Sequence, residues 1–213
     1  KVMKAYNDVI KAKDLSLFYM KKELKKGKMP YGQQIDNVAR KYLDKGIFFD
    51  ENFLGWGGED LEWAYRMEKN GANIKFLPWV SGSHIPHHRD VAKNREEEKR
   101  NFRYFLRKAQ DPLVELVVRF GDLKANKLFN TYFDTRLFQY RLLEFELDGR
   151  ILVIGTKEDY IPTAHLSLKN RYALSGIALP YEDKFFDEVI INNMDLNGDL
   201  EKLISEEAGR VKK

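Results

Sequence analysis

The sequence predicts an α/β protein, because stretches with helical spacing alternate with short apolar runs of the kind found in buried strands. Helical spacing is clearest after Gly58, where Leu61, Ala64 and Tyr65 recur at intervals of three and four. The clearest strand is the continuous apolar run 151–155, which is typical of a strand buried in a parallel sheet. At 213 residues the chain can form one or two domains with a substantial core.

Composition narrows the class of protein. The chain has no Cys, which excludes disulfides and thiolate metal sites and favours a reducing compartment, so we expect a cytoplasmic location. Its 37 basic and 33 acidic residues give a net charge of +4 on a mixed surface, so nucleic-acid binding is not indicated. No apolar run is long enough to span a membrane.

Two features of the N-terminal segment concern membrane association and the extent of the protein. The run 21–28 is rich in Lys and could contact phosphate or an anionic membrane, so peripheral membrane association stays open. The first residue is Lys1 rather than Met, so we expect the chain to be a piece of a longer protein.

The chemistry is predicted to lie in the stretch 49–66, which combines glycines, an indole and adjacent carboxylates. Gly55, Gly57 and Gly58 permit backbone conformations and a close ligand approach that a Cβ would prevent. A flat ring such as a sugar could therefore lie against the main chain, with Trp56 as its stacking face.

Glu59 and Asp60 directly precede the apolar helix positions, so both are predicted to lie in the first turn of a helix. The positive end of the helix dipole favours their ionised forms there. An ionised carboxylate can accept a proton from a hydroxyl as that hydroxyl attacks. The alternative is that the two acids only cap the helix.

The same stretch resembles a known family. Phe49-Asp50-Glu51, the run 55–60 and the helix with Tyr65-Arg66 resemble the acceptor-side motif of GT-A glycosyltransferases, notably the galactosyltransferase and chondroitin-polymerase-like groups. The resemblance implies that Asp60 is the base of an inverting hexosyltransferase. It also implies that Glu59 binds the acceptor sugar and that the donor is a nucleotide sugar such as a UDP-sugar.

Three of the four histidines lie in the segment 83–90, where close imidazoles could bind a divalent metal or be exposed loop residues. The resemblance implies a site for Mn²⁺ or Mg²⁺, with His84 as the best match to a family ligand and His87 as the second. The family's upstream Asp-x-Asp motif occurs nowhere in this sequence. We therefore expect an incomplete enzyme whose N-terminal half or partner chain is missing.

Residues 93–147 are predicted to form a helical connector. The charged run 95–100 places Glu before Lys and Arg at helical spacings, as on a solvated helix face. Asp111-Pro112 is predicted to end this helix and start a second one.

The segment 148–213 resembles a class I SAM-dependent methyltransferase, on the strand 151–155, the turn 179–187 and the helix 200–212. The methyltransferase Gly-x-Gly loop is reduced to Gly155, followed by Thr156-Lys157-Glu158, and the acidic residue of the first strand is replaced by Val153. These departures argue against SAM binding and favour a degenerate or truncated domain.

The predicted architecture is therefore the C-terminal part of a GT-A fold over 1–92, the connector over 93–147 and a partial Rossmann-like region over 148–213. The function that it implies is metal-dependent, inverting transfer of a sugar to a glycan or other hydroxyl acceptor. Two alternatives stay open: a non-catalytic interaction module built from the two remnants, and a SAM-dependent methyltransferase.

Overall fold

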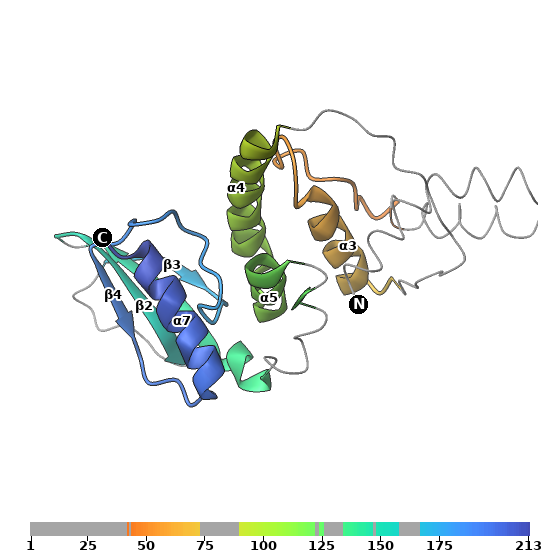
Figure 1. The fold of residues 1–213 in the computed structure, drawn as a ribbon. Helices are drawn as coiled ribbons and strands as arrows, with labels where there is room; N and C mark the ends of the chain where they lie inside the picture. The colour runs from red at the N-terminus through yellow and green to blue at the C-terminus, as the bar shows by residue number, and fades with distance from the viewer. Residues whose placement is uncertain are drawn as a thin grey trace, which may run out of the picture. The chain divides into compact units, whose positions relative to one another are not determined.

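The computed structural model describes residues 42, 44–72, 90–121, 124–125, 134–146, 148–157 and 167–213 (Figure 1). The chain divides into two compact units, residues 1–101 and 102–213, and the boundary falls inside one helix. The Lys-rich run 21–28 and the histidine segment 83–90 lie outside the described residues.

The first unit contains helix α3 (Glu59–Lys69), which confirms the helix predicted after the glycine-rich stretch. Its N-cap is Gly58, and its buried face carries Leu61, Ala64 and Met67 at helical spacing. The helix ends at Lys69 with Asn70 as its C-cap, and Gly71, which follows, has a φ of +84°.

The segment before the motif is held against α3 by its aromatic side chains. Trp63 donates from Nε1 to the carbonyl of Ile47 at 3.0 Å, and its ring stacks on Phe49 with centroids 4.7 Å apart. Tyr42, Ile47 and Met67 form a small buried cluster beside Trp63. These contacts fix the entry of the chain into the glycine-rich loop.

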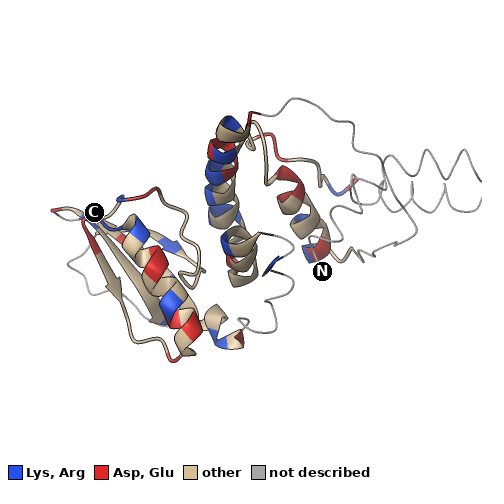
Figure 2. Ribbon diagram, viewed as in Figure 1, with Lys and Arg blue, Asp and Glu red and all other residues tan. Residues whose placement is uncertain are grey.

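Helix α4 (Val91–Ala109) begins at a cap, because the Asp90 side chain accepts a hydrogen bond from the Lys93 N–H at 3.0 Å. Opposite charges lie along α4 (Figure 2), and Lys99 pairs with Glu96 at 2.8 Å. This part of the prediction of a solvated face is confirmed. The C-terminal part of α4 belongs to the second unit, and its Phe105 and Leu106 are buried.

Helix α5 (Pro112–Phe120) starts where the sequence predicted. Asp111 is its N-cap and accepts a hydrogen bond from the Leu113 N–H at 2.9 Å, while Pro112 occupies the first turn. Gly121 follows its last residue with a φ of +71°.

The second unit is built on a mixed four-stranded sheet in the order β3-β1-β2-β4. The strands are β1 (Tyr140–Glu146), β2 (Arg150–Lys157), β3 (Ser167–Tyr172) and β4 (Glu188–Ile191). β1 pairs antiparallel with both β2 and β3, whereas β2 and β4 pair parallel with Leu152 opposite Val189.

The sheet confirms one prediction and corrects another. The strand predicted at 151–155 and the one after the acidic turn are neighbours in a parallel pair. The predicted helical connector over 93–147 contains α4 and α5, but its last part is not helical as predicted, because strand β1 follows the short 3-10 helix η1 (Thr135–Gln139) there. The sheet is nevertheless mixed, because β1 pairs antiparallel with β2 on the side opposite to β4.

Helix α7 (Gly198–Val211) follows β4, as the sequence predicted. Asn197 caps it by accepting a hydrogen bond from the Leu200 N–H at 3.0 Å. Its buried face includes Leu200 and Ile204, which are almost inaccessible to solvent. After α7, the chain forms a parallel bridge between Lys212 and Phe186, just before β4.

Candidate active site

The motif stretch folds as a tight loop that leads into α3. The loop begins with a turn at Asp50. The Asp50 side chain accepts hydrogen bonds from the backbone N–H and the side-chain amide of Asn52 at 3.0 and 2.7 Å. Phe53 is buried and donates its N–H to the Asp50 carbonyl at 3.1 Å. The loop therefore starts from a fixed turn and a buried aromatic anchor.

Three glycines give the loop its path. Gly55, Gly57 and Gly58 have φ angles of +76°, +94° and +88°, a region that residues with a Cβ occupy only at a cost. At Gly55, an added Cβ would lie 2.3–2.5 Å from the carboxylate of Glu97, and at Gly57 it would lie 3.3 Å from the Cβ of Glu98. The close neighbour of these two glycines is thus α4, whereas the sequence interpretation placed a ligand there.

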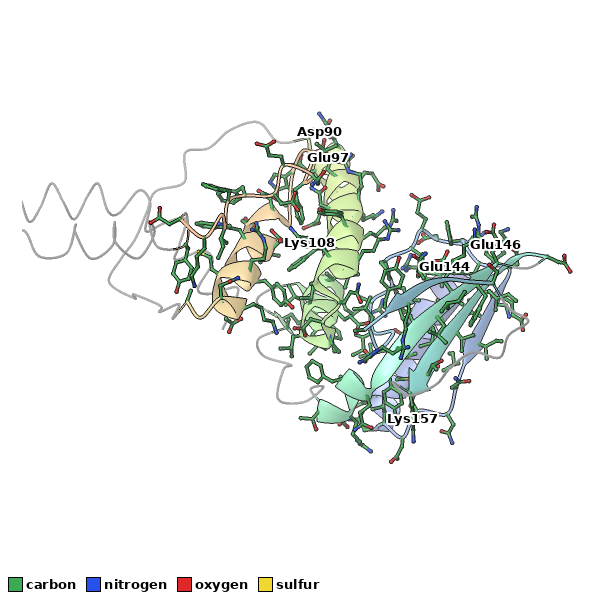
Figure 3. All side chains as sticks on the ribbon, turned by 180° about the vertical axis from the view of Figure 1, so that it is seen from behind. Asp90, Glu97, Lys108, Glu144, Glu146 and Lys157 are labelled. Carbon is green, nitrogen blue, oxygen red and sulfur yellow. The ribbon has the colours of Figure 1, made fainter. Side chains whose placement is uncertain are left out.

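Trp56 lies between these glycines and keeps its indole exposed, with 45% of the residue accessible. Its backbone is held by α4. The Trp56 N–H donates to Glu97 Oε2 at 2.8 Å, and Figure 3 shows Glu97 on this helix. The indole is therefore a free aromatic face on a fixed backbone, the arrangement that ring stacking needs.

A second α4 residue, Asn101, holds the loop from its carbonyl side. Its side-chain amide donates to the carbonyls of Leu54, Trp56 and Gly57 at 3.2, 3.3 and 2.8 Å, and only 1% of Asn101 is exposed. Arg100 also donates to the Leu54 carbonyl. The prediction that the run 95–100 is a solvated face is therefore wrong at Glu97, whose carboxylate accepts a hydrogen bond from the loop.

Glu59 and Asp60 lie in the first turn of α3, as predicted, and Figure 2 shows the acidic start of this helix. Gly58 is the N-cap and makes no side-chain cap bond. Asp60 Oδ1 accepts a hydrogen bond from the Leu61 N–H at 2.8 Å, so one of its oxygens helps to satisfy the free N–H groups of this turn.

Glu59 differs from a capping residue. Its Oε2 atom is buried and has no hydrogen-bond partner within the described part of the chain. Buried polar atoms are nearly always paired, so this oxygen is available to a water or to a bound molecule that donates a hydrogen bond. A sugar hydroxyl is a suitable donor, since a carboxylate accepts hydrogen bonds in two directions.

A third carboxylate of the first turn, that of Glu62, keeps α3 in place. Glu62 is 1% exposed and accepts a hydrogen bond from Arg66 Nε at 2.5 Å, and Arg66 also donates to the Phe48 carbonyl. This pair ties α3 to the segment before the loop, which positions Glu59 and Asp60 relative to Trp56.

The predicted metal ligands His84 and His87 lie outside the described residues. In the ranges that the structure does describe, no three His, Asp or Glu side chains gather as a metal site would require. Those same ranges contain no helix with the length and apolarity needed to cross a membrane.

In the second unit, Gly155 ends the apolar part of β2 with a φ of +82°. The space where its Cβ would point is occupied by the Met194 side chain, at 2.4 Å. In the methyltransferase resemblance this glycine would face the cofactor, whereas here a thioether packs against it.

Comparisons with known proteins identify relatives of this chain. It is 38% identical to validoxylamine A glucosyltransferase of Streptomyces hygroscopicus subsp. jinggangensis, in an alignment of 185 residues that covers 68% of this chain and 44% of that protein. The enzyme of the same name from subsp. limoneus is 28% identical, with 68% and 41% covered. Hyaluronan synthase of Pasteurella multocida is 44% identical over 46 residues, which are 22% of this chain and 5% of that protein.

This chain is homologous to glycosyltransferases. That finding confirms the class of enzyme that the stretch 49–66 predicted. The chain spans less than half the length of the two glucosyltransferases. No family model and no solved structure matches it. The named relatives are not methyltransferases, so the resemblance over 148–213 stays a prediction.

The sequence interpretation missed Glu97 and Asn101. The helical spacing was a signal for both residues. Asn101 lies four residues before Phe105, and Glu97 lies four residues before Asn101, so both share the helix face of the buried Phe105. The many charges around them concealed this spacing.

Proposed function

We propose that this chain provides the acceptor side of an inverting glycosyltransferase, in which Asp60 is the general base. The carboxylate of Asp60 would take the proton of the acceptor hydroxyl as its oxygen bonds to the anomeric carbon of the donor. The bond from that carbon to the nucleotide diphosphate would break, and the diphosphate would leave. The homology to glycosyltransferases supports the reaction class.

The orphaned Oε2 of Glu59 is the observation that carries the assignment of the acceptor site. A hydroxyl of the acceptor would donate to this oxygen while its ring stacks on the exposed indole of Trp56. Gly57 and Gly58 would shape the loop between these two groups. The acceptor is then a glycan or another ring that carries hydroxyls.

A nucleotide sugar such as a UDP-sugar is the proposed donor. Glucosyl donors are the first to test, because two relatives are named glucosyltransferases. Dependence on Mn²⁺ or Mg²⁺ through His84 and His87 is also proposed. It can be measured by transfer with and without each ion in the His84→Ala and His87→Ala variants.

The decisive experiment is a transfer screen of the intact parent protein, followed by Asp60→Asn. Removing a general base should lower kcat by about two to four orders of magnitude and leave the KM for the donor nearly unchanged. The control is Glu68→Gln, which changes an exposed acid near the end of α3, outside the stretch 49–66, and should retain activity. Full activity of Asp60→Asn would remove Asp60 from this role. Retention of the donor's anomeric configuration in the product, seen by NMR, would exclude the inverting mechanism.

A further inference from the structure

The peptide groups on both sides of Trp56 are held by α4. The Trp56 N–H belongs to the peptide that joins it to Gly55, and this N–H donates to Glu97. The Trp56 carbonyl belongs to the peptide that joins it to Gly57, and this carbonyl accepts from Asn101. Because the orientations of these two peptides define φ and ψ, the two side chains together fix the backbone conformation of Trp56.

The side chains of Asn101 and Glu97 complement the polar groups of the loop backbone. Asn101 presents N–H donors to three loop carbonyls, and Glu97 presents an oxygen to a loop N–H. Burying a side-chain amide costs free energy of desolvation unless the amide forms hydrogen bonds. The buried amide of Asn101 forms them with the carbonyls of the loop. Yet the side chain at the centre of this clamp, the Trp56 indole, is left 45% exposed.

We propose that Asn101 and Glu97 are positioning residues that hold Trp56 ready to receive the acceptor ring. This inference rests on the proposed role of Trp56 in acceptor binding. With φ and ψ fixed, only the two side-chain torsions of Trp56 remain to be ordered, so less conformational freedom is lost when a ring stacks on the indole. The clamp would thus set affinity for the acceptor and leave the donor unaffected.

The first test needs no activity. Hydrogen exchange of the Trp56 backbone amide, followed by NMR on this chain, should become about tenfold or more faster in Glu97→Ala, because its acceptor is lost. Glu97→Gln keeps an oxygen at that position and should restore most of the protection. Asn101→Ala should also accelerate exchange at Trp56, whereas the matched control Asn94→Ala on the same helix should not.

Amides in the middle of α3, such as that of Met67, report on general loss of structure. Their exchange should stay within about twofold of the wild type in all four variants. Unchanged exchange at Trp56 in both Glu97→Ala and Asn101→Ala would overturn the proposal. Equal acceleration at Trp56 and Met67 would also overturn it, since the two residues would then support the unit as a whole.

The second test uses the intact parent protein in the transfer assay. Asn101→Ala should raise the KM for the acceptor about tenfold to a hundredfold, as expected for a misplaced binding group, and leave the KM for the donor unchanged. An unchanged acceptor KM, with faster exchange at Trp56, would overturn the positioning role even if Asp60→Asn is inactive. If the parent transfers no sugar, the proposed function fails, and the exchange experiment still decides whether the clamp exists.

Discussion

Gly55 and Gly46 have nearly the same φ angle but different surroundings. Their φ angles are +76° and +72°, so Ala at either position costs about 1–2 kcal/mol from left-handed strain. Around Gly46 an added Cβ meets nothing within 4 Å, whereas at Gly55 it meets the Glu97 carboxylate. Comparing Ala substitutions at the two glycines therefore separates the cost of backbone strain from the cost of a clash with Glu97 on α4.

We therefore expect Gly55→Ala to destabilise the protein more than Gly46→Ala. The added methyl would push the Glu97 side chain away and break its hydrogen bond to the Trp56 N–H, a further loss of about 1–3 kcal/mol for a bond to a charged group. The measurement is the free energy of unfolding in denaturant. In a Glu97→Ala background the two glycine substitutions should cost the same, and a persistent difference would show that Glu97 is not the cause.

At the scale of elements, α5 and the loop 175–178 are joined by one buried carboxylate. Glu115 on α5 is inaccessible to solvent. It accepts hydrogen bonds of 2.7–3.3 Å from the N–H and hydroxyl of Ser175 and from the N–H groups of Gly176 and Ala178. Burial raises the pKa of Glu115, and the hydrogen bonds lower it. Burial is the larger effect, so the pKa rises to about 7.

This shift predicts how stability depends on pH. The pKa of Glu115 is near 4.5 in the unfolded chain and about 7 in the folded one, so between these values the folded protein holds a proton that the unfolded chain has lost. The contribution of Glu115 is complete below pH 4.5 and declines by about 3 kcal/mol as pH rises through 7. In Glu115→Gln, the free energy of unfolding should therefore fall less across this range.

The control is Glu201→Gln, which changes an exposed acid on α7 and should keep the slope of the wild type. Denaturant unfolding at several pH values between 4.5 and 7.5 measures both variants. Identical slopes in the wild type and in Glu115→Gln would show that Glu115 does not titrate in this range.

At the scale of the whole molecule, the 213-residue chain aligns with less than half of each glucosyltransferase relative. Its sequence also lacks an Asp-x-Asp motif. The metal ion that neutralises a nucleotide diphosphate takes several ligands, and one or two imidazoles cannot supply all of them.

We expect this chain alone to bind UDP in the millimolar range or not detectably by calorimetry, with little change on adding Mn²⁺. The intact parent protein, measured in parallel, should bind UDP more tightly. Micromolar, Mn²⁺-dependent binding by the 213-residue chain would show that the donor site lies within it.

Features that depend on neighbouring residues could be predicted from the sequence. Gly58 and the apolar spacing after it indicated α3, Asp111-Pro112 indicated the start of α5, and the apolar run 151–155 indicated a strand of the parallel type, which is β2. The Gly-Trp-Gly-Gly-Glu-Asp stretch indicated a glycosyltransferase, in agreement with the relatives of the chain. Caps, helical periodicity and motifs are local, so the sequence displays them directly.

The features that needed the tertiary structure depend on residues far apart in the chain. β1 was hidden in a stretch predicted to be helical, because its identity as a strand comes from pairing with β2 and β3. Glu97 and Asn101 lie 41 and 45 residues after Trp56, and nothing in their own charged neighbourhood marks the loop as their partner. Only folding brings a buried amide against three carbonyls, because the energy of a hydrogen bond depends on distance and not on position in the sequence.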